Sequence, residues 1–319
     1  MISIVNKNPT NDIQSIETNS SYHVSVLLKE SIDALDIKPN GVYVDCTFGG
    51  GGHSREILKS LGPDGKLFVF DQDEAAAKNC PDDNRIIFIQ QNFRNIQRFL
   101  RVHQVLKVDG ILADLGVSSH QFDEAERGFS IRFDASLDMR MNVKQQLTAA
   151  EIIANYSEHQ LHKLFEKYGE VTNAKTLAKM IVEKRALAPI ATIAQFKAAV
   201  HSIVKGNPNK YFAQVFQALR IEVNDEMGAL YDLLEQSLQL LKINGRLAVI
   251  TFHSLEDRIV KHFIKYNIHE DLQIDEIFGT TAPRLLIPVH KKPIVPAEAE
   301  LKSNPRSRSA KLRVAVKID

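Results

Sequence analysis

The stretch Asp45-Cys-Thr-Phe-Gly-Gly-Gly-Gly-His53 decides the fold that this sequence predicts. It begins inside a short apolar run typical of a strand, residues 42–48, and leads into a helical pattern over residues 53–61. Four glycines remove every Cβ from the turn, so the backbone can adopt positive φ and approach a ligand closely. The following helix offers unpaired N–H groups and a positive dipole end. The turn therefore predicts a strand–loop–helix unit that binds a ligand.

Further strands and helices alternate on the carboxyl side of this unit. Apolar runs at residues 66–71, 85–90 and 108–114 predict strands, and the segments near 74–79 and 93–103 between them predict helices. Near-continuous apolar strands that alternate with helices indicate a mostly parallel sheet covered on both faces. The sequence thus predicts an α/β protein.

Two of these strands end in an aspartate. Asp71 closes the second strand, nineteen residues after Gly52, which is where a Rossmann-like fold places an acid against ribose hydroxyls. Asp114 closes the fourth strand. Because ligands of open α/β sheets bind beyond the carboxyl ends of the strands, we expect Asp114 to face the same crevice as the glycine loop.

The glycine loop and the later acid leave several alternatives open. They fit NAD(P) enzymes and S-adenosylmethionine enzymes alike, and a tight turn without a ligand is a third interpretation. The loop is not G-x-G-x-x-G, and no G-x-x-x-x-G-K-[ST] is present, so a P-loop is excluded.

The middle of the chain has a different pattern. Residues 148–205 contain only helical signals, including S/T-x-x-E/Q capping boxes that start at Thr148, Ser157 and Thr192. The α/β pattern then resumes, with a helix over 224–241, strands over 246–252 and 311–318, and a helix that starts at Ser254. We predict a disordered tail (1–21), a Rossmann-like domain (22–135 and 213–319) and a helical insertion (136–212) that recognises the substrate.

Composition narrows the class of protein further. Of 319 residues, 44% are hydrophobic and 25% are charged, as in an ordinary globular protein, and the net charge is +1. Residues 284–317 hold nine Lys and Arg against two Glu, a basic end that suits a polyanion. The two cysteines have no metal-ligand spacing, and we find no secretory signal or membrane span. We expect a cytoplasmic protein without a metal site.

With these features assembled, the chain resembles the MraW/RsmH family from about Tyr22 to its C-terminus. The resemblance is carried by His23-Val-Ser-Val-Leu-Leu, Asp45 to Ser54, Asp109 to Ser119, Asp123 to Ser130, Leu137-Asp-Met-Arg-Met141, Phe216-Gln-Ala-Leu-Arg-Ile221, Thr251 to Val260 and Asn304 to Arg313. It implies a Rossmann-like class I methyltransferase fold, with a mostly parallel seven-stranded sheet and an inserted all-helical domain. It also implies transfer of a methyl group from S-adenosylmethionine to the N4 amine of a cytidine in small-subunit (16S) rRNA.

The resemblance implies a set of cofactor contacts on the glycine loop and after the strands. They are Gly51, Gly52, His53, Asp71, Phe93, Asp114 and Gln121. Many amino-methyltransferases carry an N/D-P-P-Y/F tetrapeptide, which this chain lacks. Without it, the first candidate for the group that directs the acceptor amine is Asp114, which could instead hold the cofactor, and His253 is a second candidate, as a proton acceptor.

Arginine is the side chain best suited to phosphates and stacked bases. The candidates for contact with 16S rRNA are Arg127, Arg132, Arg140, Arg220, Arg258, Arg306 and Arg308. A cytidine must leave its stack to be methylated, so we expect a pocket flanked by backbone contacts.

Two other functions compete with this hypothesis. An NAD(P)-dependent oxidoreductase is supported only by the strand–glycine–acid pattern. A non-catalytic RNA-binding assembly factor would keep the fold without the reaction, although the intact glycine loop, Asp71 and Asp114 speak against it. The sequence does not indicate an oligomeric state.

Overall fold

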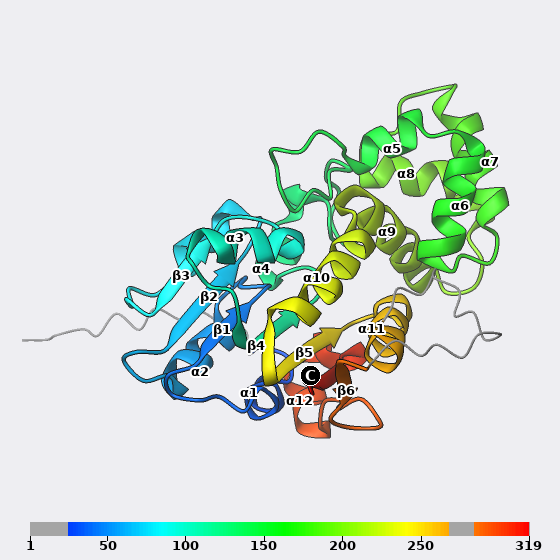
Figure 1. Cartoon of the computed structure of the whole chain (residues 1–319). Helices are drawn as coiled ribbons and strands as arrows, with labels where there is room; N and C mark the ends of the chain where they lie inside the picture. Colours follow the sequence, from blue (N-terminus) through cyan, green and yellow to red (C-terminus); the bar gives the residue numbers. More distant parts are fainter. Residues whose placement is uncertain (1–24, 268–283, 319) are drawn as a thin grey trace, which may run out of the picture.

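A seven-stranded sheet organises the protein in a computed structural model that describes residues 25–267 and 284–318 (Figure 1). The predicted disordered tail, residues 1–21, lies outside the described residues. The strands follow the order β3-β2-β1-β4-β5-β7-β6. They are β1 (Val42–Asp45), β2 (Lys66–Phe70), β3 (Ile86–Ile89), β4 (Val108–Asp114), β5 (Leu241–Thr251), β6 (Leu286–Pro288) and β7 (Lys311–Lys317).

The first five strands are parallel, and β7 runs antiparallel to both of its neighbours. Parallel strands in a sheet with two covered faces need apolar side chains on both sides. The apolar runs of β1, β2 and β4 meet this need, and the predicted mostly parallel seven-stranded sheet is confirmed.

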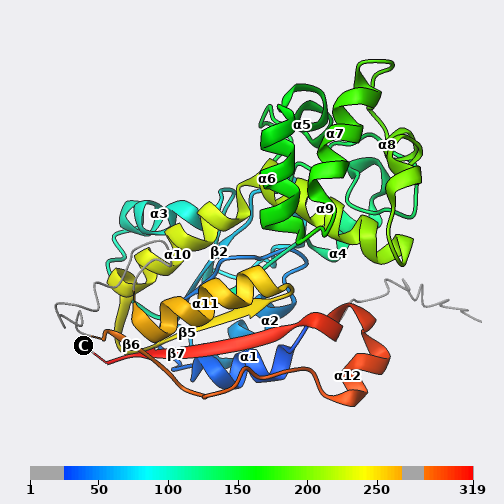
Figure 2. The same ribbon diagram turned by 90° about the vertical axis from the view of Figure 1, so that its right-hand side faces the viewer.

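Helices cover the sheet on both faces, as Figure 2 shows. Alternate residues of each strand point to opposite faces, so Val44 packs in the cluster with α3, α10 and α11, while Tyr43 packs in the cluster with α1 and α2. These helices are α1 (Leu28–Leu35), α2 (Gly52–Ser60), α3 (Ile96–Val102), α10 (Glu226–Leu240) and α11 (Ser254–Tyr266). Shorter elements are η1 (Glu74–Asn79), η2 (Phe93–Asn95), α4 (Ser119–Asp123), η3 (Ala125–Arg127), α12 (Glu298–Ser303) and η5 (Pro305–Ser309).

A lobe of helices with its own apolar core stands apart from the sheet, in green in Figure 1. It contains α5 (Ala149–Asn155), α6 (Glu158–Gly169), α7 (Ala174–Arg185), α8 (Ile193–Val200), η4 (His201–Ile203) and α9 (Pro208–Asn224). Helix α9 packs in this core and runs through the predicted boundary between residues 212 and 213. Its far end reaches the sheet, so α9 joins the lobe to the rest of the protein.

The three predicted capping boxes are confirmed at the starts of α5, α6 and α8. In the first, the Thr148 hydroxyl accepts the Glu151 N–H, and the Glu151 carboxylate accepts the Thr148 N–H. These contacts satisfy N–H groups that the first helical turn leaves unpaired.

Replacing Thr148 with Ala is expected to lower the free energy of unfolding by about 1 kcal/mol, since the Glu151 N–H loses its acceptor. Urea unfolding followed by circular dichroism measures the change. Thr148→Ser keeps the hydroxyl and should leave the midpoint close to that of the unchanged protein. An equal loss in both variants would contradict a capping role.

The predicted helix over 224–241 needs a correction. Asp225 adopts a left-handed conformation, φ 46°, which ends α9 at Asn224 and lets α10 begin at Glu226. The predicted strand over 246–252 is likewise longer, because Leu241 already pairs with Val108. The register then shifts, so that Arg246 pairs with Gly110, and the intervening residues of β5 bulge, with Asn244 at φ 66°.

Among the residues that the structure describes, no helix is both long and apolar enough to span a membrane.

Candidate functional site

The candidate site lies at the carboxyl ends of β1, β2 and β4, where the glycine loop leaves the sheet. Asp45 is buried at the end of β1 and organises this loop. Its two carboxylate oxygens accept the Thr47 N–H at 3.1 Å and the Ser54 hydroxyl at 2.6 Å. The carboxylate thereby ties the end of the strand to the first turn of α2.

Two glycines of the loop are required by close contact or by backbone conformation. A Cβ on Gly52 would lie 2.0 Å from the Ser25 hydroxyl oxygen. Gly51 has φ +74°, and a Cβ there would lie 2.8 Å from the Phe48 ring. An L side chain at either position would therefore force the loop or its neighbours to move.

Asp71 follows β2 and faces the same loop. Its carboxylate accepts the N–H groups of Gly49 and Asp73, each at 2.8 Å. Burial raises the pKa of Asp71 to about 6, although these two amides favour the charged form. Each oxygen keeps a lone pair for a further donor, so this carboxylate can accept hydrogen bonds from ligand hydroxyls.

Asp114 closes β4 on the other side of the loop. Its backbone N–H donates to the Thr47 hydroxyl at 2.6 Å, and its Oδ1 is buried with no hydrogen-bond partner in the described part of the chain. Burial, reinforced by the negative charges of Asp45, Glu256 and Glu300, raises the pKa of Asp114 well above its ordinary value. A buried acceptor without a donor indicates a place for a ligand group.

His53, at the start of α2, lies next to Asp114. Its Nε2 is 3.1 Å from the Val26 carbonyl oxygen, and its Nδ1 is 3.8 Å from Asp114 Oδ2. Burial lowers the pKa of His53, which keeps the ring neutral. A carbonyl can only accept, so Nε2 carries the proton and the Nδ1 lone pair faces Asp114.

Gln121 lies in a buried network behind the loop. Its side-chain amide donates to Asp73 Oδ2 at 2.9 Å, and its oxygen accepts the Ser118 N–H at 3.1 Å. Arg127 pairs with the same Asp73 oxygen at 3.0 Å. Burial would raise the pKa of Asp73, but the hydrogen bonds from Gln121, Ala75 and Arg127 outweigh it and lower the pKa.

A narrow pocket opens between these strand ends and α10. Phe93 forms part of its apolar wall together with Met227 and Leu230, while Gln72 and Asn92 supply polar edges. The remaining lining residues are Thr47, Leu115, Gly116, Met141, Asn224, Glu226, Ala229 and Glu256. An apolar wall that contains an aromatic ring, together with nearby amide groups, suits a planar heterocycle. Of the seven cofactor residues implied by the resemblance, Phe93 alone lines this pocket, while Asp71 and Asp114 lie at the loop beside it.

One group near the pocket was missed by sequence reasoning. Glu226, His253 and Glu256 bring ligand atoms within 4.8 Å of one another, a spacing that could hold a metal ion. Glu226, however, binds Arg220 through two hydrogen bonds, at 2.8 and 2.9 Å. Glu256 stands three residues after His253, a capping-box spacing that could have revealed its role.

The histidine of this group caps α11. His253 Nδ1 accepts the Glu256 N–H at 3.4 Å, so in the neutral ring the proton lies on Nε2. Nε2 is buried and lies 3.1 Å from Glu256 Oε1, without the alignment of a hydrogen bond. In this arrangement the helix cap engages His253 Nδ1, and Nε2 faces Glu256. Glu226 forms its ion pair with Arg220 beside this cap.

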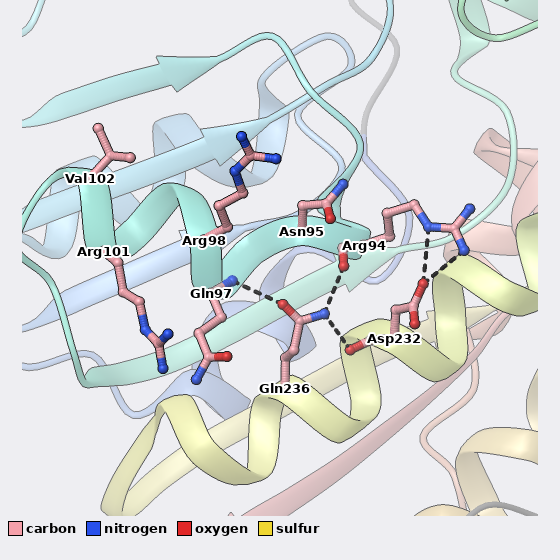
Figure 3. Close-up of a pocket in the computed structure, with 8 residues that line it drawn as sticks. All are labelled: Arg94, Asn95, Gln97, Arg98, Arg101, Val102, Asp232 and Gln236. Atoms are coloured by element: carbon pink, nitrogen blue, oxygen red, sulfur yellow. Dashed lines mark hydrogen bonds and ion pairs between the residues drawn. The ribbon is translucent and has the colours of Figure 1, made fainter.

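A wider hollow lies elsewhere, in the groove between α3 and α10 (Figure 3). Its lining residues are Arg94, Asn95, Gln97, Arg98, Arg101, Val102, Asp232 and Gln236. Arg94 pairs there with Asp232 at 2.8 Å, and Gln236 joins the two helices. None of the cofactor residues implied by the resemblance lines this groove, so we place the candidate site at the smaller pocket.

The arginines proposed for RNA contact divide into two groups. Arg127, Arg140 and Arg220 are engaged internally, with Asp73, Asp138 and Glu226 respectively. Arg132 and Arg308 are exposed and have no acidic partner in the described ranges, while Arg258 pairs with Glu170 and Arg306 with Asp123 at the surface. Because their side chains are exposed, Arg132, Arg258, Arg306 and Arg308 are accessible to a large ligand such as RNA.

The sheet has the strand order and the antiparallel β7 of a class I S-adenosylmethionine-dependent methyltransferase. The glycine loop after β1 and the acids after β2 and β4 complete the features that define this class. The residues fit that cofactor, because a Cβ at Gly51 or Gly52 would disturb the glycine loop and the Asp71 carboxylate keeps lone pairs for ribose hydroxyls. The chain belongs to the MraW methylase family, whose sequence profile matches residues 20–318.

Curated relatives resemble the chain over nearly its whole length. The protein named ribosomal RNA small subunit methyltransferase H of Flavobacterium johnsoniae is 53% identical, over 94% of this chain and 99% of its own length. The proteins of the same name from Christiangramia forsetii and Bacteroides fragilis are 52% and 51% identical, over 93% and 94% of this chain and 98% and 99% of their own lengths.

Proposed function

We propose that this protein transfers a methyl group from S-adenosylmethionine to the exocyclic N4 amine of a cytidine in small-subunit (16S) rRNA. Membership of the MraW methylase family and the names of the relatives support the reaction and the substrate. The observation that carries the chemistry is the buried, unpartnered Oδ1 of Asp114 beside the glycine loop.

The residues that would hold the cofactor surround the loop. We assign Gly51 and Gly52 to close backbone contact, His53 to the amino-acid end, and Asp71 to the ribose hydroxyls. Phe93 would stack on the adenine, and Gln121 would keep the loop after β4 in place through Asp73. When bound, S-adenosylmethionine supplies an electrophilic methyl group.

Asp114 would act on the acceptor amine. The lone pair of a cytosine N4 amine is conjugated with the ring, so the amine is a weak nucleophile. An ionised Asp114 that accepts an N–H bond from this amine would direct its lone pair and later take the proton. The raised pKa of Asp114 makes it a stronger base than an exposed aspartate, which suits this step.

Exposed arginines near the site would hold the RNA backbone. We assign this role to Arg132, Arg258, Arg306 and Arg308, while Arg140 and Arg220 serve to hold the fold around the pocket. The helical lobe, which has its own apolar core, would position the rRNA. A ribosomal substrate places the protein in the cytoplasm.

The decisive experiment is transfer of labelled methyl from S-adenosylmethionine to small ribosomal subunits and naked rRNA from cells that lack this protein. We expect the label in N4-methylcytidine after nucleoside analysis. Absence of label from both substrates, with cofactor binding confirmed, would overturn the rRNA assignment. RNA binding without transfer would favour a non-catalytic assembly factor.

The affinity for S-adenosylhomocysteine should rise with pH through about 6 and then level off, because Asp71 accepts ribose hydroxyls best when it is ionised and its pKa is about 6. Asp71→Asn should bind S-adenosylhomocysteine about 10–100-fold more weakly at pH 8, because a hydrogen bond to a charged group is lost. The variant should also show a flatter pH dependence of the affinity. Isothermal titration calorimetry measures both effects. Asp64→Asn, at an exposed position, is the control; an unchanged pH profile in Asp71→Asn would contradict the assignment.

A further inference from the structure

The C-terminal strap, which we define as α12 and η5 (residues 298–309), precedes β7 and contacts two other parts of the chain. In the first contact, Glu300 Oε1 accepts the Leu27 N–H at 2.9 Å, just before α1. In the second contact, Arg306 pairs with Asp123 of α4 at 2.5 Å, and its guanidinium lies 5.1 Å from the centre of the Phe122 ring. The first contact joins residues near the two ends of the described chain.

The Leu27 turn, residues 25–27, has an unusual backbone. Leu27 adopts a left-handed conformation with φ 50° and ψ 38°, which is rare for a bulky residue. Its side chain is fully buried, and its N–H has the Glu300 carboxylate as acceptor. A residue stays in such a conformation only when its surroundings hold it there.

This turn lies directly against the glycine loop. The Ser25 hydroxyl occupies the space that a Cβ on Gly52 would fill. The next residue, Val26, presents its carbonyl to His53 Nε2 at 3.1 Å. The conformation of Leu27 therefore determines where the carbonyl that fixes the His53 ring is placed.

We propose that Glu300 is a positioning residue for the cofactor site. By holding the Leu27 N–H, it places the Val26 carbonyl against His53, keeps the proton on Nε2 and turns the Nδ1 lone pair toward Asp114. Loss of the acceptor at residue 300 releases the turn, and the His53 ring then exchanges between its two tautomers. The inference rests on the assignment of His53 to the cofactor site under the proposed function.

The test compares side chains of similar length at residue 300 in the full chain. Glu300→Gln keeps an oxygen acceptor for the Leu27 N–H, whereas Glu300→Met removes it. Glu298→Gln, on the exposed face of the same helix, is the matched control. The readouts are the affinity for S-adenosylhomocysteine by calorimetry and the His53 tautomer by 15N NMR of histidine-labelled protein, with thermal unfolding to verify folding.

We expect Glu300→Met to bind S-adenosylhomocysteine about tenfold more weakly, which corresponds to about 1.4 kcal/mol. In the same variant, exchange between the tautomers should bring the two His53 ring 15N signals together. Glu300→Gln and Glu298→Gln should stay within about twofold of the unchanged protein and keep separate signals. Equal behaviour of the Met and Gln variants in both readouts would overturn the proposal.

If Glu300→Met does not fold, Glu300→Asp, whose carboxylate is one methylene too short to reach Leu27, replaces it in the same comparison. Neither readout uses RNA, so failure of the rRNA assignment leaves the outcome of this test unaffected.

Discussion

Replacing Asp114 with Asn is expected to lower the rate of methyl transfer by about 10²–10⁴-fold, the usual contribution of a positioned acid or base. Asn keeps the shape of the side chain but cannot take the proton that the amine releases. Single-turnover assays with labelled S-adenosylmethionine measure the rate. The affinity for S-adenosylhomocysteine should change less than the rate, because the glycine loop and Asp71 remain in place.

The pH dependence gives this prediction a second test. The pKa of Asp114 is raised, and its carboxyl group can take up the proton of the amine only when it is ionised. The rate should therefore rise with pH through that raised pKa, and Asp114→Asn should lose this rise. Asp64→Asn, at an exposed position, is the control. A variant that keeps both the rate and the pH profile would remove Asp114 from the reaction.

Replacing Arg220 with Met should lower the free energy of unfolding by about 3 kcal/mol, as expected when one partner of a buried ion pair is removed. Only 18% of the Arg220 side chain and 10% of the Glu226 side chain are exposed. Without Arg220, the carboxylates of Glu226 and Glu256 would face each other across the pocket wall with less positive charge to balance them. Urea unfolding followed by circular dichroism measures the loss.

Two further variants show whether the loss comes from the ion pair. Arg220→Met combined with Glu226→Gln should recover part of the stability, because the unbalanced charge is gone. Arg258→Met removes an exposed arginine that pairs with Glu170 at 3.4 Å, and it should change stability by less than about 1 kcal/mol. If Arg220→Met stays stable but loses affinity for rRNA, Arg220 contacts RNA, as the sequence suggested.

Local sequence signals predicted much of the fold. The strands β1 to β5 and β7, the glycine loop and the three capping boxes depend on residues close in sequence, such as Thr148 and Glu151, and all are present in the structure. The short strand β6 was not predicted. The break between α9 and α10 at Asp225 was missed because glycine is the usual sequence signal for a left-handed conformation, and this position holds an aspartate. The placement of Asp71 and Asp114 at one crevice followed from the rule that parallel strands share their carboxyl edge.

By itself, the sequence determined the class of fold, the loop after β1 and the acids after β2 and β4, because periodicity and turn chemistry act over a few residues. Tertiary structure alone decided which charged side chains are buried in ion pairs, as Arg220 is with Glu226. It also decided the tautomer of His53, whose Nε2 donates to the Val26 carbonyl. It also decided the contact of Glu300 with Leu27. These properties depend on burial and on contacts between distant parts of the chain, and a pKa or a tautomer is set only when such neighbours are in place.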